Sequence, residues 1–152
     1  MSRICVQQED FDVSRELQAI CDARTDIGAT VTFVGLVRDM NLDDSVSAMT
    51  LQHYPGMTEK ALHKIVAEAS QRWEVQDATV IHRVGKLSPS DQIVLVCIAS
   101  SHRHDAFEAC SFIMDYLKTR APFWKKEILK DGSSRWVDAR ESDDHAADRW
   151  KE

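Results

Sequence analysis

Side chains that could bind an anion recur at three places where a helix or strand is expected to end. They are Arg38, His102, Arg103, Lys118, Lys125 and Lys126. Guanidinium, imidazole and ammonium groups neutralise phosphates and carboxylates and donate hydrogen bonds to them. The chain has 19 Lys and Arg against 25 Asp and Glu, a formal charge of −6. Any cluster of cations must therefore be local, and we expect it to bind a small anion.

Lys118 and Lys125 flank Pro122 and could take part in proton transfer. Neighbouring cations make each other harder to ionise and partial burial acts in the same direction, so we expect the pKa of Lys118 to be lowered. A lysine tuned in this way can act as an acid or a base, or stabilise an acyl or oxyanion intermediate. For either lysine alone, a solvated surface charge is the simpler interpretation. Their shared position at a Pro-Phe-Trp corner favours a site.

A helix and a strand must position these lysines. Apolar residues recur at helical spacing over residues 110–117, and Lys118 follows on the edge of that apolar face, at the margin of the core. Pro122 should end the helix one or two residues earlier, because proline disfavours helical geometry in the residue before it. Residues 123–129 are expected to be extended, with Lys125 on the same side as Phe123.

The remaining chain alternates predicted strands and helices. We expect strands at residues 3–7, 29–37, 46–54, 78–84, 92–100 and 134–137, and helices capped by Asp12 and by Thr58, the latter running to Trp73. The run 92–100 is apolar nearly throughout, which predicts the central strand. His102 and Arg103 follow it directly, at a favoured place for a binding site. A solvated capping loop is the alternative interpretation of these two residues.

The composition is that of one ordinary globular domain, residues 1–152, with a charged C-terminal arm from about residue 138 to 152. The negative charge argues against a nucleic-acid-coating surface or a polybasic membrane anchor. The four cysteines form no C-x-x-C pair, so we interpret them as reduced core thiols. No apolar leader opens the chain and no apolar run approaches the ~20 residues of a membrane span. We expect a cytoplasmic protein.

No local motif supplies a nucleophile. The G-x-S-x-G elbow, the P-loop, the dinucleotide-binding glycines and the H-E-x-x-H motif are absent from the sequence, and no Ser or Cys has an adjacent general base. His53 and His63 have no partner at metal-ligand spacing. We therefore predict no metal and no cofactor, and an enzyme built on this chain would take its nucleophile from another molecule.

Several segments resemble, in order, the large catalytic subunit of molybdopterin synthase. They are TVTFVGLVRD, LQHYPGMTEKAL, VIHRVGKL, SSHRHDAFEA, MDYLKTRAPFWKKE and RWVDARESD, and they extend over nearly the whole chain. The resemblance implies an α+β fold, an α/β hammerhead with an additional antiparallel β subdomain. It also implies a sulfurtransferase of molybdenum cofactor biosynthesis that forms the dithiolene of molybdopterin on cyclic pyranopterin monophosphate, also called precursor Z.

The resemblance further implies that a partner supplies the sulfur. In that family the thiocarboxylated Gly-Gly C-terminus of a small ubiquitin-like subunit enters the pocket of the large subunit, which would account for the missing nucleophile. The implied assembly is a homodimer of large subunits with one small subunit at each end, a heterotetramer.

Site residues are implied by matching the motifs. Lys118 and Lys125 match the catalytic lysines, with Lys118 next to the incoming thiocarboxylate. Residues matching the substrate pocket or its walls are Phe33, Leu36, Val37, Arg38, His102, Arg103, Met114, Lys126, Glu127 and Arg140. Arg140 could act in its own chain or from the dimer mate. Leu36 stands where relatives can carry a basic residue, which removes one expected substrate contact.

Two other classes of function remain open from the sequence. A phosphate-ester hydrolase could use His102 as its acid or base and would turn over substrate with no sulfur donor. A non-catalytic, anion-binding scaffold could merely hold the small subunit. In that case neutralising Lys118 and Lys125 would change affinity alone.

Overall fold

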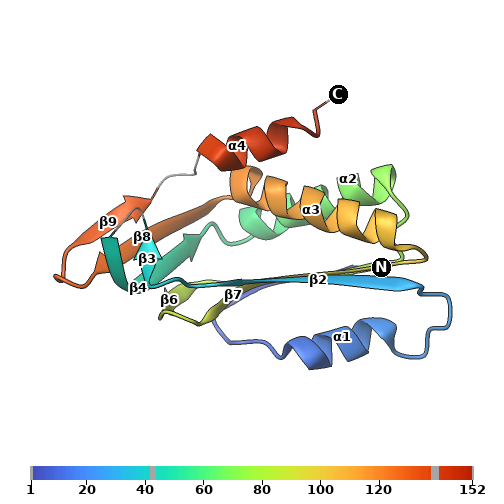
Figure 1. Cartoon of the computed structure of the whole chain (residues 1–152), viewed down its shortest axis with the longest axis horizontal. Helices are drawn as coiled ribbons and strands as arrows, with labels where there is room; N and C mark the ends of the chain where they lie inside the picture. Colours follow the sequence, from blue (N-terminus) through green and yellow to red (C-terminus); the bar gives the residue numbers. More distant parts are fainter. Residues whose placement is uncertain (1, 42–43, 138–140, 152) are drawn as a thin grey trace.

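A four-stranded and a five-stranded sheet form the frame of the computed structural model, which describes residues 2–41, 44–137 and 141–151 (Figure 1). The elements are β1 (Ser2–Gln7), α1 (Val13–Cys21), β2 (Ala29–Leu36), β3 (Met40–Asn41), β4 (Asp44–His53), α2 (Met57–Arg72), β5 (Asp77–Arg83), β6 (Gly85–Leu87), β7 (Gln92–Ser100), α3 (Arg103–Arg120), β8 (Phe123–Leu129), β9 (Ser134–Val137) and α4 (Glu141–Asp148). The predicted strands and helices are confirmed to within one or two residues at their ends. The short strands β3 and β6 had no sequence signal.

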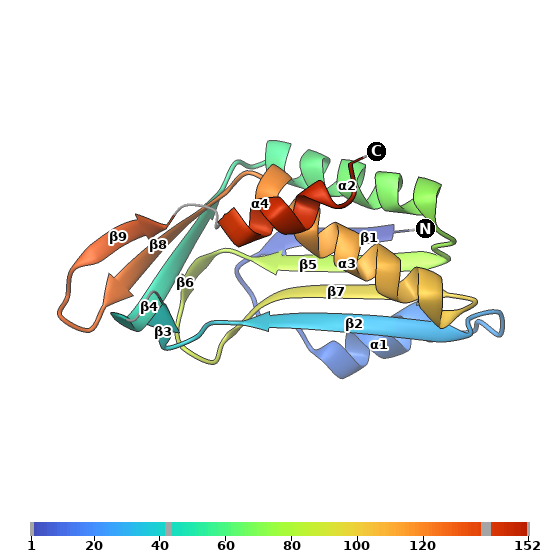
Figure 2. The ribbon, with the colours of Figure 1, turned by 45° about the horizontal axis from the view of Figure 1, so that its top comes forward.

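The first sheet has the strand order β1-β5-β7-β2, with β1 parallel to β5 and the other pairs antiparallel. Helices α2 and α3 cover one face and α1 covers the other (Figures 1 and 2). Strand β7 is an inner strand and is buried from Val94 to Ser100. A strand covered on both faces has no solvent side to alternate with, which explains its continuous apolar run. The prediction of a central strand is confirmed.

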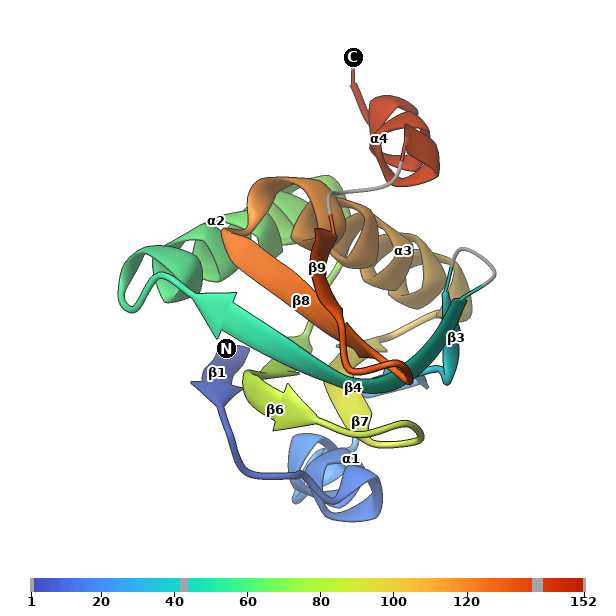
Figure 3. The ribbon, with the colours of Figure 1, turned by 90° about the vertical axis from the view of Figure 1, so that its left-hand side faces the viewer.

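The second sheet is antiparallel and has the order β3-β4-β8-β9, with β6 also pairing with β4. Figure 3 shows β4 and β8 crossing the end of the first sheet, with β9 on the outer side of β8. The α+β class with an additional antiparallel subdomain is therefore confirmed.

Helix α3 lies across the first sheet and carries the last part of the core (Figure 2). Phe112 and Ile113 are fully buried against the apolar face of α2, including Leu62 and Ile65. Burial of each such side chain contributes about 1.5–3 kcal/mol. The helix ends at Arg120 and the capping residue Ala121 is extended, with ψ of 133°, as Pro122 predicts.

One local prediction was wrong. Thr58 does not cap α2, because the helix begins at Met57 and Gly56, with φ of 84°, is its capping residue. The Thr58 hydroxyl instead donates to the carbonyl oxygen of Pro122 at 2.9 Å and ties α2 to the corner before β8. After β7, helix α3 begins at Arg103 with His102 as its capping residue.

The C-terminal arm forms α4, which packs on α3 (Figure 1). Trp150 is buried and its ring makes edge contacts with Trp73 and Phe112, with centroids 5.3 and 5.6 Å away. Its indole Nε1 donates to the Asp115 carboxylate at 2.6 Å. The arm is thus anchored to its own chain, one turn before Lys118.

Candidate functional site

A cavity of about 580 Å³ lies where the end of β2 meets β4, β8 and the C-terminal half of α3. Its apolar wall includes Phe33, Val37, Met49, Leu51, Met114, Leu117 and Phe123. A hollow of this size and apolar character holds a small organic ligand, with a few polar groups to orient it. The predicted wall residues Phe33, Leu36, Val37 and Met114 all line it.

Three cationic side chains share this cavity: Arg38, Lys118 and Lys125. Arg38 follows β2, Lys118 lies in the last turn of α3, and Lys125 lies on β8 opposite Leu51 of β4. The Pro122 corner turns β8 back along α3, and this brings the two lysines to one hollow as the sequence suggested. Their charges favour an anionic group, either a phosphate or a carboxyl derivative.

The burial of the lysines differs from the expectation. Lys118 is exposed and Lys125 is half-buried, whereas the sequence placed Lys118 at the core margin. Within one chain, Lys118 borders the cavity with its ammonium group accessible to water.

Glu127 also lines the cavity, but its carboxylate is occupied. The residue is 4% exposed. One oxygen accepts from Asn41 Nδ2 at 2.7 Å and the other from Arg135 Nε at 3.1 Å. Arg135 also donates to Asp44 at 2.7 Å. Glu127 therefore ties the β8–β9 hairpin to β3 and β4, and its hydrogen bonds leave it poorly suited to act as a base.

His82 is a cavity residue that the sequence reasoning missed. It lies near the end of β5, is 5% exposed and stacks on Phe123 with ring centroids 3.8 Å apart. Burial lowers the pKa of His82 to about 4, despite the hydrogen bond between Nδ1 and the Arg83 carbonyl oxygen, and the charge of Lys118 acts in the same direction as burial. The cavity thus has a neutral imidazole beside its cations. A histidine inside an otherwise apolar strand was the available signal.

The described residues offer no metal site, since no three His, Cys, Asp or Glu side chains gather as ligands would among them. Its cations are Arg38, Lys118 and Lys125, while the buried Glu127 and His82 are hydrogen-bonded to protein and Asp143 adds one carboxylate to the lining. The arrangement therefore suits an anionic organic ligand better than a metal ion.

Comparison with known proteins decides the family. Residues 6–120 match the family described as "MoaE protein". A Ralstonia nicotianae protein named molybdopterin synthase catalytic subunit is 59% identical over 150 residues, covering 99% of this chain and 85% of that protein. The chain belongs to the MoaE family.

Solved structures of MoaE relatives have the same fold. The molybdopterin biosynthesis MoaE protein of Burkholderia ambifaria superposes on this MoaE chain with a TM-score of 0.84 at 56% identity, covering 99% of this chain and 98% of that chain. A complex of subunits 1 and 2 of molybdopterin-converting factor from Helicobacter pylori superposes with a TM-score of 0.67 at 22% identity, covering 92% and 90%, and shows the fold alone. None of the described helices has the length and apolar character of a membrane span.

Two predicted site residues of the MoaE chain, His102 and Arg103, lie outside this cavity. They are exposed at the start of α3, whereas Lys118 lies near its end. Fifteen residues of helix separate Arg103 from Lys118, which is about 22 Å along the axis at about 1.5 Å per residue. One copy of the chain does not bring these groups together.

Three predicted residues remain: Lys126 on β8, Leu36 at the end of β2, and Arg140. Lys126 is not among the cavity-lining residues; its ammonium lies 5.8 Å from the ring centroid of Trp136. Leu36 lines the cavity and is 53% exposed. It therefore presents an apolar surface at the position where relatives can carry a basic residue. Arg140 lies outside the described residues.

Proposed function

We propose that this chain is the catalytic subunit of molybdopterin synthase, a sulfurtransferase of molybdenum cofactor biosynthesis. It would transfer sulfur to cyclic pyranopterin monophosphate and so form the dithiolene of molybdopterin. The observation that carries the proposal is the single cavity bordered by Arg38, Lys118 and Lys125, in a chain 59% identical to a protein named for this activity.

The sulfur donor in this proposal is the thiocarboxylated C-terminus of a small ubiquitin-like subunit. Its sulfur forms a bond to a substrate carbon while a carbon–oxygen bond of that carbon breaks and the oxygen leaves with a proton, and water then cleaves the acyl–sulfur bond. The thiolate stays on the substrate and the carrier leaves as a carboxylate. A second carrier repeats the cycle for the second sulfur. This chain would need no nucleophile of its own, consistent with the absence of nucleophile motifs from its sequence.

The cations have separate tasks in this scheme. Arg38 would bind the substrate phosphate, where a guanidinium can donate two parallel hydrogen bonds. Lys118 and Lys125 would stabilise the negative charge that develops on the acyl oxygen, as a fixed pair of donors does in acyl transfer. The apolar wall formed by Phe33 and Met114 would hold the ring system of the substrate.

A second copy of the chain would complete the phosphate site. Strand β2 is an edge strand, and Phe33, Leu36 and Met40 on or just after it are 40%, 53% and 45% exposed. Apolar patches of this kind mark interaction surfaces. A two-fold axis beside β2 would set two α3 helices antiparallel and bring His102 and Arg103 of one copy towards Lys118 of the other. The proposed assembly is a homodimer with one small subunit at each end.

The proposal places the reaction in the cytoplasm, where a thiocarboxylate and free thiols persist. All four cysteines of the chain are free. Burial raises the pKa of the Cys97 thiol and raises that of Cys110 to about 12, which makes both unreactive.

The test is Lys118→Ala with thiocarboxylated carrier and cyclic pyranopterin monophosphate. Because a charge-stabilising donor is removed, we expect product formation to fall by about a hundredfold or more with an unchanged unfolding transition. Lys64→Ala removes an exposed lysine from α2 and serves as the matched control. Near-normal product from Lys118→Ala would refute the catalytic role, and turnover without any carrier would favour the hydrolase.

A further inference from the structure

The chain around Arg38 is held by a turn rather than by a strand. The pairing of β2 with β7 shifts register between Gly35 and Leu36 and ends there. Val37, the next residue, then donates its N–H to the carbonyl oxygen of Asp91 at 2.9 Å, and its own carbonyl oxygen accepts from Ser90 N at 2.8 Å. Both backbone groups of Val37 are therefore fixed by residues 88–91, and this sets the direction in which Arg38 leaves the sheet.

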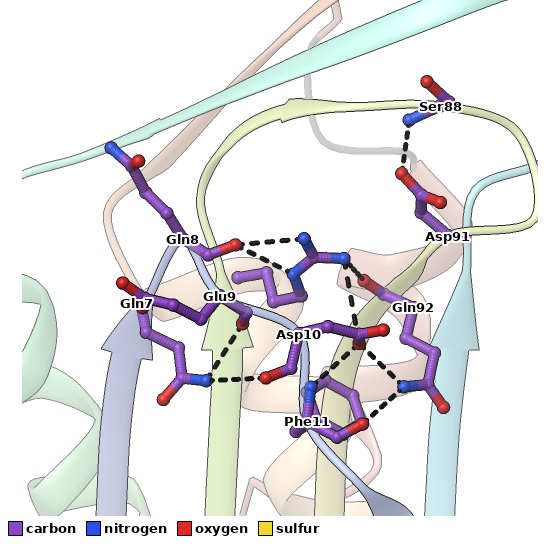
Figure 4. Close-up of polar contacts among 9 residues, drawn as sticks. Gln7, Gln8, Glu9, Asp10, Phe11, Ser88, Asp91 and Gln92 are labelled. Atoms are coloured by element: carbon purple, nitrogen blue, oxygen red, sulfur yellow. Dashed lines mark hydrogen bonds and ion pairs between the residues drawn. The ribbon is translucent and has the colours of Figure 1, made fainter.

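The turn depends on one carboxylate. Asp91 accepts from the backbone N–H of Ser88 at 2.8 Å, and its own N–H donates to the Ser88 carbonyl oxygen at 3.0 Å (Figure 4). Ser90 has a φ of 76°, which a residue with a side chain adopts only when neighbouring contacts compensate the strain. Asp91 does not line the cavity, so any influence of its side chain on a ligand must pass through the turn.

A junction of polar groups anchors the turn to the first sheet. Gln92, directly after Asp91, donates from Nε2 to Asp10 Oδ1 and to the Phe11 carbonyl oxygen, both at 2.8 Å (Figure 4). Arg83, whose side chain is 13% exposed, donates to the Gln8 carbonyl oxygen at 3.0 and 3.1 Å and to that of Gln92 at 3.0 Å.

The junction also has an electrostatic component. The Arg83 guanidinium lies 3.8 Å from Asp10 Oδ1. The hydrogen bond from Gln92, together with that from Phe11 N–H, lowers the pKa of Asp10. Residues 8–11 are thus joined to Arg83 and Gln92, which lie on either side of the turn at residues 88–91. The turn is attached to the first sheet by these hydrogen bonds and can hold the backbone of Val37 in one position.

We propose that Asp91 is a positioning residue for Arg38, so that the turn at residues 88–91 determines how tightly the phosphate of the substrate is bound. The inference rests on the proposed function of the cavity. A guanidinium on a fixed backbone needs little further ordering when it meets an anion, whereas one on a loose segment must be ordered at the expense of affinity. Lys118 on α3 and Lys125 on β8 are held by other contacts, so a change at Asp91 should not affect them.

The experiment compares Asp91→Ala with Asp91→Asn and Asp131→Ala. Loss of the hydrogen bond to Ser88 should raise KM for cyclic pyranopterin monophosphate about fivefold with kcat nearly unchanged. Asp91→Asn keeps an oxygen that can accept from Ser88 and should restore KM. Asp131 caps the turn between β8 and β9 in the same way, accepting from Ser133 N at 2.8 Å, and Asp131→Ala should leave KM unchanged.

A double substitution separates positioning from general loosening of the fold. If Asp91 acts through Arg38, then Asp91→Ala should lower kcat/KM about fivefold in the natural chain and very little in Arg38→Ala. An equal factor in both backgrounds, or equal KM for Asp91→Ala and Asp131→Ala, would overturn the proposal.

Amide hydrogen exchange of Val37 tests the inference without any activity. Asp91→Ala should accelerate exchange at Val37 about fivefold, while Asp131→Ala should not. An unchanged Val37 amide in Asp91→Ala overturns the positioning role even if KM rises. The two proposals can fail separately. If the natural chain forms no dithiolene but Asp91→Ala still accelerates exchange at Val37, the proposed function is rejected and the structural link between Asp91 and Val37 stands.

Discussion

Two buried ionisable side chains, Glu127 and His82, line the cavity without adding to its positive charge. The carboxylate of Glu127 is bonded on both oxygens by Asn41 and Arg135, so it is held by protein donors rather than directed at a ligand. His82 is neutral because burial outweighs its hydrogen bond to the Arg83 carbonyl oxygen. The cations that line the cavity are Arg38, Lys118 and Lys125, which are exposed or half-buried, and they outnumber the one other carboxylate of the lining, that of Asp143.

At this scale we predict a pH dependence of stability that belongs to His82. Its pKa is about 4 in the folded chain against 6.5 as the ordinary value. Between these values the unfolded chain binds a proton that the folded chain does not, so stability is full above pH 6.5 and is lost as the pH falls towards 4. Urea unfolding at pH 7 and at about pH 4.5 should differ by about 2 kcal/mol from this group alone.

His82→Gln provides the comparison, because glutamine does not titrate. Carboxylates contribute equally to the pH dependence of stability in the natural chain and in His82→Gln. The difference between the two pH dependences therefore isolates His82. The same loss of stability on acidification in His82→Gln and in the natural chain would show that His82 is not the group responsible.

At the scale of elements, α3 connects the core to the cavity and α4 secures its end. Lys118 follows Tyr116 and Leu117, which are buried, so its backbone position is fixed by core packing. Asp115, one turn earlier, accepts from Trp150 Nε1 at 2.6 Å and from Arg149 at 3.0 Å. The C-terminal arm thus stabilises the turn of helix that carries Lys118.

We predict that Trp150→Ala destabilises the fold by about 3 kcal/mol, because it removes a buried ring from between Trp73 and Phe112 and leaves Asp115 with one partner fewer. Urea unfolding followed by far-UV circular dichroism measures the change. Trp124→Ala is the matched control, since Trp124 is 47% exposed on β8, and it should change stability by about 0.5 kcal/mol or less. Equal effects of the two substitutions would contradict the anchoring role of α4.

At the scale of the whole molecule, one chain does not bring all of the proposed anion-binding residues together. Arg38, Lys118 and Lys125 border one cavity, while His102 and Arg103 are exposed about 22 Å away along α3. The exposed apolar residues of the edge strand β2 lie next to that cavity. A second copy is the arrangement that accounts for both observations.

This arrangement predicts complementation between two inactive chains. Lys118→Ala and the double variant His102→Ala/Arg103→Ala should each be nearly inactive alone. Mixed after reversible unfolding, they should form hybrid dimers in which one of the two sites is intact, and recover about a quarter of the natural activity. Activity no greater than the sum of the separate variants would place His102 and Arg103 outside the site.

The sequence by itself determined the elements and several of the site residues. Helical periodicity and Pro122 defined the end of α3, and alternation placed Phe123, Lys125 and Glu127 on one side of β8, where all three line the cavity. These features follow from short-range geometry, namely the period of a helix or strand and the restrictions of proline, so neighbouring residues contain the whole signal.

Only the tertiary structure decided which distant groups meet. Separation along a helix converts sequence proximity into distance, so His102 and Lys118 lie apart although one element carries both. Conversely, Arg135 contacts Asp44, and the turn at residues 88–91 contacts Val37, although these segments lie far apart in the sequence. Burial also depends on the whole fold. It left Lys118 exposed and made His82 neutral, because desolvation is set by everything packed around a group and not by its neighbours in sequence.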